Sequence, residues 1–452
     1  MRSRKTLFIS LYILLPMVMT AVFASPGTGE RIELTRNCPE GIAVTTHIDS
    51  RRIEIEPVDT RRLPEFFSAA ITGGPPTGKD DEKGLRWRTV RLRQEHLFSS
   101  FIRETGRTEI VLLKDVLRLN LFPGLEFRAF LSRVDQTRDS YTWAGRIEGR
   151  ADRGTVNLTV REGAILGRVN IYGEGIFSLR PAGDGLYEII ELDYSKARFA
   201  PPIHPPESAV RSSSSEPGVS FASDGITEIM VVWSTDAAAA AASSGTSIQA
   251  EIALAVSLIN TTYENSGITQ RVQLVESAAA GYTASEYHPE TNPTPSATDL
   301  YRLQDPNDGY MDEIHLLRLT SQADCVALIT NGWDGNIIGQ GFALKSDVSF
   351  FFKYYAFSVV DRHAFNYQTL THELGHNMGA GHELDNPFSQ GPQYYSYSSG
   401  YHYPPVTNDS VWHTMMSYRH GGSYKIEHFS NPDVSFEGNP TGMPGPDGNN
   451  NA

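Results

Sequence analysis

The stretch Thr371–His382 constrains this chain more than any other, because it places three histidines and a glutamate at fixed offsets. His372 and His376 are four residues apart, so a helix would project both rings from one face, one turn apart. Two neutral imidazoles held in this way can take two corners of a zinc tetrahedron. Glu373 faces the same opening without being a ligand, which suits a general base for a water molecule.

A glycine allows the chain to leave this helix after the second histidine. Gly379 can adopt a positive φ at no steric cost, and the turn returns His382 to the metal as a third ligand. Three protein ligands leave a fourth position for water, which indicates a catalytic site and not a closed structural one. A bare H-E-x-x-H also occurs by chance on polar helices. Here the glycine and third histidine have the required offsets, and Met416 lies in a second matching stretch, Thr414–Tyr418.

The two stretches together resemble the metzincin zinc peptidases, whose pattern is H-E-x-x-H-x-x-G-x-x-H followed by a methionine turn. The resemblance implies a zinc-dependent endopeptidase that acts on protein or peptide substrates. It places Met416 beneath the zinc as an apolar floor, and it leaves Tyr418 either to donate to the oxyanion or to pack on the turn. The implied metal ligands are His372, His376 and His382, and the implied catalytic residues are Glu373 and Tyr418.

The resemblance covers roughly Ile226–Gly442 and is greatest to the reprolysin-like bacterial branch, which includes the peptidyl-Asp metallopeptidases. Ala323–Val326 matches a strand that precedes the site in that branch, and Phe429–Pro432 matches a segment after the methionine turn. Two residues depart from it. Glu383 follows the third histidine as in astacins, and Tyr418 stands where astacins and serralysins carry a tyrosine. An astacin- or serralysin-like enzyme is therefore the alternative.

The first 24 residues predict a secretory signal peptide. Arg2, Arg4 and Lys5 form a basic start, Leu7–Met19 is apolar, and small residues up to Ala24 supply a cleavage site. The apolar run is too short for a confident membrane span. We expect a secreted protein, extracellular or periplasmic, without a stable membrane anchor.

Composition divides the rest of the chain. Residues 25–200 read as a β-rich domain, with a clear antiparallel meander over Tyr141–Asp193. Residues 201–224 form a Pro- and Ser-rich linker, 225–440 the peptidase domain, and 441–452 a disordered tail. The layout is that of a zymogen, and the turn pattern of the first half is similar to prodomains of bacterial peptidyl-Asp-type metallopeptidases. The resemblance implies an α+β fold, with a metzincin-type catalytic domain after a prodomain that inhibits it.

The peptidase half shows a regular order of elements. Periodicity predicts strands at Ile226–Trp233, Arg271–Val275, Cys325–Ile329 and Ala356–Val360, the last leading to the histidine helix. Further predicted elements are a helix over Ser247–Thr262, a helix around Thr298–Leu303, a segment near Glu313–Leu319 and an edge strand at Phe342–Leu344. The order is that of metzincin catalytic domains.

The net charge of −14 is unevenly distributed. Residues 25–211 carry 28 basic and 27 acidic side chains, whereas residues 212–452 carry 8 and 26. Nucleic-acid binding requires a basic face, so it is excluded as a function. The charge difference gives the two halves a Coulombic reason to associate.

Several other residues leave alternatives open. Cys38 can occupy the fourth zinc position as a switch, pair with Cys325, or remain a free thiol. Extra histidines would close the zinc site, so we interpret them as surface or subsite residues; they include His363, His402, His413, His420 and His428. Four aspartates lack EF-hand spacing for calcium and fit solvated loops better, namely Asp305, Asp308, Asp312 and Asp334. A non-catalytic binding protein on a peptidase scaffold is a rival function, but it would not need Glu373.

Overall fold

The structure is a computed structural model of the whole chain. The chain divides into two compact units, Met1–Pro57 with Leu97–Lys114, and Val58–His96 with Asp115–Ala452. The expected signal peptide, Cys38 and residues 206–224 of the linker lie outside the described residues. The described residues are 35–37, 43–45, 50–68, 85–102, 108–150, 153–194, 200–205, 225–288, 290–333, 337–345, 352–384, 393–405, 410–418, 422–445 and 450.

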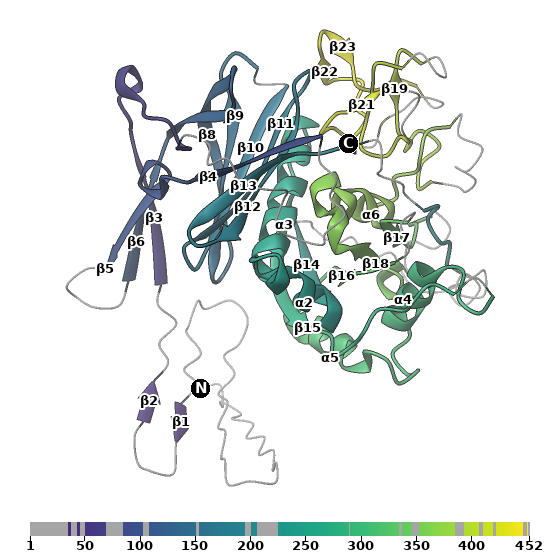
Figure 1. Cartoon of the computed structure of the whole chain (residues 1–452). Helices are drawn as coiled ribbons and strands as arrows, with labels where there is room; N and C mark the ends of the chain where they lie inside the picture. Colours follow the sequence, from purple (N-terminus) through teal and green to yellow (C-terminus); the bar gives the residue numbers. More distant parts are fainter. Residues whose placement is uncertain are drawn as a thin grey trace, which may run out of the picture. The chain divides into compact units, whose positions relative to one another are not determined.

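The first unit is made of short strands (Figure 1). β3 (Ser50–Glu56) runs parallel to β6 (Thr108–Lys114), and β5 (Phe98–Ile102) pairs with the other edge of β6 in the antiparallel direction. β1 (Thr35–Asn37) and β2 (Ala43–Thr45) form a separate antiparallel pair. These strands agree with the β-rich composition expected of residues 25–200.

An eight-stranded antiparallel sheet begins the second unit. Its order is β4-β13-β12-β11-β10-β9-β8-β7, so seven strands that are consecutive in sequence are also neighbours in space. This confirms the predicted meander. Short turns at glycine-containing positions link most of these strands. The bounds are β4 (Arg86–Arg91), β7 (Val116–Phe122), β8 (Leu125–Gln136), β9 (Ser140–Ile147), β10 (Gly154–Arg161), β11 (Ala164–Ile171), β12 (Gly175–Gly183) and β13 (Leu186–Glu191).

A five-stranded sheet forms the centre of the second half of the chain. Its order is β15-β14-β16-β18-β17, in which four strands are parallel and β17 (Gly339–Gly341) runs antiparallel at the edge. The predicted edge strand, Phe342–Leu344, lies directly after the observed one, Gly339–Gly341. Phe342 instead forms an isolated bridge to Ile203. The parallel strands are β14 (Ile226–Trp233), β15 (Arg271–Ala279), β16 (Cys325–Thr330) and β18 (Phe357–Asp361).

In the described residues, five α-helices accompany this sheet. The predicted helices are found, and α2 is an additional one whose alanine-rich sequence carries no apolar stripe of large residues. Its start is capped by Ser234, whose side chain accepts from the Ala237 N–H. The helices are α2 (Thr235–Ser243), α3 (Ile248–Asn265), α4 (Pro295–Gln304), α5 (Asp312–Ser321) and α6 (Thr369–Asn377), and short 3₁₀ turns are Thr60–Arg62, Gln94–His96, Phe352–Tyr354 and Arg362–Tyr367.

Helix α3 is buried on more than the one face that its periodicity predicts. Fifteen of its 18 residues are buried. Ile252 and Ile259 belong to the main core beneath the five-stranded sheet, whereas Leu254 and Leu258 pack on Leu166 of β11 in the eight-stranded sheet. Figure 1 shows α3 between the two sheets. The helix therefore connects the β-rich region to the core that supports the histidine helix.

Short strands complete the C-terminal region. Thr441, the first residue of the expected tail, has a fully buried side chain whose hydroxyl donates to the Asn431 carbonyl. Residues 446–449 and 451–452 lie outside the described part of the chain. The strands are β19 (His402–Tyr403), β20 (Trp412–His413), β21 (Tyr424–Lys425), β22 (Ser435–Phe436) and β23 (Asn439–Pro440).

The fold is thus a mixed α/β arrangement with a large β-rich N-terminal region. The domain boundary predicted near residue 200 does not coincide with the division into compact units, because the eight-stranded sheet and the second half share one unit. Contacts between the eight-stranded sheet and the second half do not show whether proteolysis separates them, so the boundary near residue 200 stays a prediction. Among the described residues, no helix is long and apolar enough to cross a membrane.

Candidate metal centre

Helix α6 places the first two histidines on one buried face. It begins after Gln368, which has a left-handed φ of 58° and whose side chain donates to Thr262 of α3. His372 and His376 are both fully buried, and their ring centroids are 4.8 Å apart. The predicted i, i+4 arrangement is therefore present and rests on the core helix α3.

The hydrogen bonds of these two rings direct their other nitrogen atoms to one point. His372 Nδ1 lies 2.9 Å from the Met415 carbonyl, and His376 Nδ1 lies 2.9 Å from the Ala380 carbonyl. A carbonyl can only accept, so each Nδ1 carries the proton and each Nε2 keeps its lone pair. This is the tautomer that metal binding through Nε2 requires.

A turn at Gly379 returns the third histidine to the same point. The φ of this glycine is +92°, and the Ala380 N–H donates to the Gly375 carbonyl to close the helix. His382 is 2 % exposed, and its Nε2 lies 3.1 Å from the Nε2 atoms of both His372 and His376. The three rings thus converge as the sequence motif predicts.

The donor set fits a zinc ion. The ligating atoms of the three histidines all lie within 4.8 Å of one another. Tetrahedral ligands at 2.0–2.1 Å from zinc would be about 3.3 Å apart, close to the two Nε2 separations. Burial lowers the pKa of all three rings, to about 4 for His376, and the neighbouring imidazoles lower the pKa of His372 and His382 further. Neutral rings are the form that binds a metal.

Glu373 directly follows the first histidine of this triad, and its carboxylate has no hydrogen-bond partner in the part of the chain that the structure describes. The residue is fully buried. Burial raises its pKa well above the ordinary value, and the charge of Lys425 opposes this shift. A buried carboxylate without partners is costly in a folded chain, so the geometry indicates a partner that comes from outside, such as water or substrate.

Two glycines of the edge strand β17 make room for Glu373. A Cβ atom on Gly339 would lie 2.8 Å from Glu373 Oε1, and one on Gly341 would lie 3.2 Å from Oε2. Only a residue without a side chain fits this close to the carboxylate. The histidine motif does not indicate that glycines are needed at positions 339 and 341.

Comparison with known proteins agrees with this geometry. Residues 227–430 match the Reprolysin_5 family, described as Metallo-peptidase family M12. Two proteins named peptidyl-Asp metalloendopeptidase from Stenotrophomonas maltophilia, strains R551-3 and K279a, are 28 % and 29 % identical, each over 71 % of this chain and 78 % of the relative. A third of that name, from Xanthomonas campestris pv. campestris, is 28 % identical over 63 % of this chain and 64 % of its own length.

These matches support a reprolysin-like metallopeptidase. Metallopeptidases of family M12 depend on zinc, so zinc is the metal that the triad suits. This assigns the protein to the zinc metalloendopeptidases, which hydrolyse peptide bonds. A solved structure, metalloproteinase-II from Bacteroides fragilis, aligns over 62 % of this chain and 85 % of its own with 11 % identity and a TM-score of 0.32, a likeness too weak to add to this assignment.

The methionine stretch of this peptidase lies against the histidine helix. Met416 is fully buried, and a Cβ atom on Gly375 of α6 would lie 2.6 Å from its sulfur. The Tyr418 ring lies 4.3 Å from the His382 ring, between centroids. Burial raises the pKa of Tyr418, and the nearby carboxylates of Glu373 and Glu383 raise it further, so the phenol stays protonated and can donate.

Glu383 and Lys425 are site residues whose part the sequence did not indicate. Glu383 is 1 % exposed, and its Oε2 accepts from the Tyr418 backbone N–H at 2.9 Å. Lys425 is 3 % exposed on β21, and burial lowers its pKa to about 7, with the Arg168 charge acting in the same direction. The position of Glu383 directly after the third histidine was its only signal. Lys425 had none.

The remaining candidates lie elsewhere. Among the described residues, the three-histidine group alone gathers metal-ligating atoms in this way. His402 and His413 bond to the hydroxyls of Ser410 and Ser423, and His363 bonds to Asp361. Cys325 is a buried free thiol whose pKa is raised to about 12 by burial. Asp305, Asp308 and Asp312 accept from nearby backbone N–H groups, while Asp334 and His420 lie outside the described residues.

Proposed function

We propose that the protein is a secreted endopeptidase in which Glu373 is the general base and the three histidines hold the catalytic zinc. The observation that carries the proposal is the convergence of three Nε2 atoms beside a buried carboxylate that has no hydrogen-bond partner in the described part of the chain. Zinc held there would acidify a water molecule and polarise a peptide carbonyl. A metzincin-type architecture, with Met416 beneath the metal, is part of the same proposal.

The protein side chains have separate tasks in this mechanism. Glu373 takes a proton from the attacking water and later gives it to the leaving nitrogen. Its raised pKa suits the second step, since a carboxyl group with a high pKa holds the proton until the amine departs. The Tyr418 phenol, 4.3 Å from the His382 ring between centroids, can donate to the oxyanion.

A chelation assay with a matched variant tests the proposal. The processed protein should cleave a quenched peptide, lose this activity in a chelator and regain it with added zinc. Glu373→Gln should keep one zinc per chain by elemental analysis but lose about 10²–10⁴-fold in turnover. His376→Ala should lose the zinc. A Glu373→Gln protein that cleaves peptides at the wild-type rate would contradict the base assignment.

The names of the relatives suggest a substrate. Because those proteins are called peptidyl-Asp metalloendopeptidases, we extend the proposal to peptides that contain aspartate. Mass mapping of a peptide library cut by the processed protein checks this. Cleavage that is indifferent to replacing Asp by Asn would argue against it, whereas a non-catalytic binding protein would cut neither peptide.

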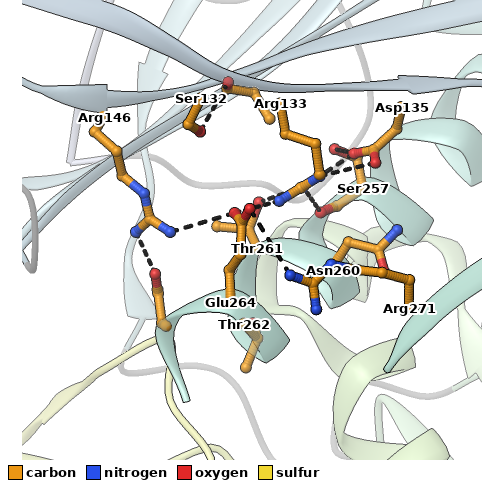
Figure 2. Close-up of polar contacts among 12 residues, drawn as sticks. Ser132, Arg133, Asp135, Arg146, Ser257, Asn260, Thr261, Thr262, Glu264 and Arg271 are labelled. Carbon is orange, nitrogen blue, oxygen red and sulfur yellow. Dashed lines mark hydrogen bonds and ion pairs between the residues drawn. The ribbon is translucent and has the colours of Figure 1, made fainter. Parts of the chain in front are cut away.

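We also propose that the protein is made with a signal peptide and as a zymogen, with residues 25–200 as an inhibitory prodomain. Contacts between the eight-stranded sheet and α3 support a bound prodomain (Figure 2). Arg133 of β8 pairs with Glu264 and also donates to Thr261 at 3.1 Å. Arg146 of β9 pairs with Glu264 as well. These arginines face acids of the second half, as the uneven charge suggests.

Limited proteolysis tests the zymogen. The full chain should be nearly inactive, and cutting within residues 201–224 should produce a fragment of catalytic-domain size together with activity. Mass analysis of the secreted protein should find Ser25 as its first residue. Equal activity in cut and uncut protein would mean that the first half is a permanent accessory domain.

A further inference from the structure

The chain places a short segment of its own along the edge of the five-stranded sheet. The Ile203 N–H donates to the Gly341 carbonyl at 2.9 Å, and the Ala343 N–H donates to the Ile203 carbonyl at 2.9 Å. The Gln340 side chain donates to the Pro201 carbonyl at 3.0 Å. Ile203 therefore forms a one-residue parallel bridge to Phe342, directly after the edge strand β17, and its side chain packs on the main core.

This edge is the part of the sheet that adjoins the catalytic residues. Gly339 and Gly341 leave space only for the Glu373 carboxylate on that side. Three residues after Gly341, the Leu344 N–H donates to the carbonyl of His376 at 3.0 Å. A peptide that lies on this edge is thus next to the base and to a metal-ligating histidine. Edge strands commonly bind extended peptides through their free N–H and C=O groups.

We infer that residues 201–204 act as an internal blocking strand, which holds the backbone groups of Gly341 and Ala343 that an extended substrate would need. The inference rests on the proposed peptidase function and specifies how that site is kept closed. The pairing depends on one residue, because Pro201, Pro202 and Pro205 have no N–H to donate. In this segment the prolines limit the strand to a short contact that can be released.

His204 follows this contact and lies near the histidine triad. Its charge is among the smaller causes that lower the pKa of His376, after burial. His204 is not a member of the group of converging metal-ligating atoms. The block therefore acts through the backbone of the segment and does not require His204 to bind the metal.

Two substitutions at one position separate the backbone from the side chain. Ile203→Pro removes the N–H that donates to Gly341, whereas Ile203→Ala keeps both backbone bonds and loses only side-chain packing. In the uncut full chain, Ile203→Pro should raise the rate of quenched-peptide cleavage roughly 5- to 100-fold over Ile203→Ala, since a buried carbonyl loses its donor. Gel analysis during the assay confirms that the chain stays uncut.

Hydrogen exchange supplies a readout without catalysis. It is measured in a Glu373→Gln background, which prevents self-cleavage, on a peptide that covers Gly339–Leu344. Ile203→Pro should deprotect the Ala343 amide relative to Ile203→Ala, while the amides of α3 stay protected and report an intact fold. Unchanged exchange at Ala343 would overturn the inference.

The outcomes also distinguish this inference from the proposed function. If the cut protein cleaves peptides but the two uncut variants are equally slow, the blocking strand is wrong and the peptidase proposal stands. If the cut protein cleaves nothing, the peptidase proposal fails and the block of a substrate fails with it. If His204→Ala activates the uncut chain as strongly as Ile203→Pro without faster exchange at Ala343, the backbone account is wrong.

Discussion

Glu383 joins the two parts of the metal centre, because its Oε2 accepts a hydrogen bond from the backbone N–H of Tyr418 at 2.9 Å. The residue directly follows the third histidine, and its partner stands two residues after Met416. The bond thus holds the turn of His382 against the methionine stretch. Both the His382 ring and the Tyr418 ring, 4.3 Å apart between centroids, depend on this connection for their position.

We predict different effects for two substitutions of Glu383. Glu383→Gln keeps an oxygen that can accept from Tyr418, so kcat/KM should remain within about threefold of wild type. Glu383→Ala leaves the N–H without this acceptor and should lower kcat/KM or zinc affinity by roughly 10–100-fold. Peptide cleavage and competition with a chromophoric chelator measure the two quantities. Equal losses in both variants would show that the charge matters and not the hydrogen bond.

The space around the base gives a second prediction. Gly339→Ala would place a Cβ atom 2.4 Å from Thr369 Cγ2 and 2.8 Å from Glu373 Oε1, so the carboxylate must move. We expect kcat to fall at least about tenfold with zinc retained, because a small misplacement of a catalytic group is costly. Gly422→Ala is the control, since nothing lies within 4 Å of its Cβ position. A Gly339→Ala enzyme with wild-type kcat would contradict the proposed crowding.

The sequence predicted the local parts of this site well. The ligand offsets in the motif are local in the chain, so the convergence of His372, His376 and His382 followed from helix geometry and one glycine turn. The antiparallel meander could also be predicted from the sequence, because period-two alternation and turn residues recur at short intervals. Strand bounds such as Ile226–Trp233 agree with the prediction.

Contacts between distant segments could not be predicted in this way. The apolar stripe of α3 indicated one buried face, but Leu254 and Leu258 are covered by a strand nearly 90 residues upstream. The charge of Lys425, on β21, acts on Glu373, and Ile203 at the start of the linker bridges to Phe342. Nothing in a local pattern specifies which distant element will cover a given face, so these contacts required the structure.

One such contact is an ion pair that is buried between Arg168 of β11 and Glu427. The two side chains are 1 % and 3 % exposed. Arg168→Met would leave the Glu427 carboxylate buried without its counter-charge and should lower the free energy of unfolding by about 3–5 kcal/mol. The double variant Arg168→Met/Glu427→Gln should recover part of this loss, because Thr155 can still donate to the amide oxygen. Chemical denaturation of the wild type, the two single variants Arg168→Met and Glu427→Gln, and the double variant measures the coupling, and additive losses would contradict it.

Acid stability should depend on a histidine outside the metal centre. Burial lowers the pKa of His428 from 6.5 to about 3, and the charge of Arg146 acts in the same direction. Between these two pH values the unfolded chain binds a proton at this residue and the folded chain does not. The free energy of unfolding therefore falls as the pH decreases from about 6.5 to about 3, by up to about 5 kcal/mol.

His428→Phe removes this proton while it retains a ring against Phe436, whose centroid lies 5.5 Å from that of His428. We expect the variant to lose less stability than wild type between pH 6.5 and 4, as measured by denaturant unfolding at each pH. The three metal-site histidines are present in both proteins, so the difference between the two curves isolates residue 428. Parallel curves would mean that the folded chain accommodates a charged His428, and the burial argument for this residue would then fail.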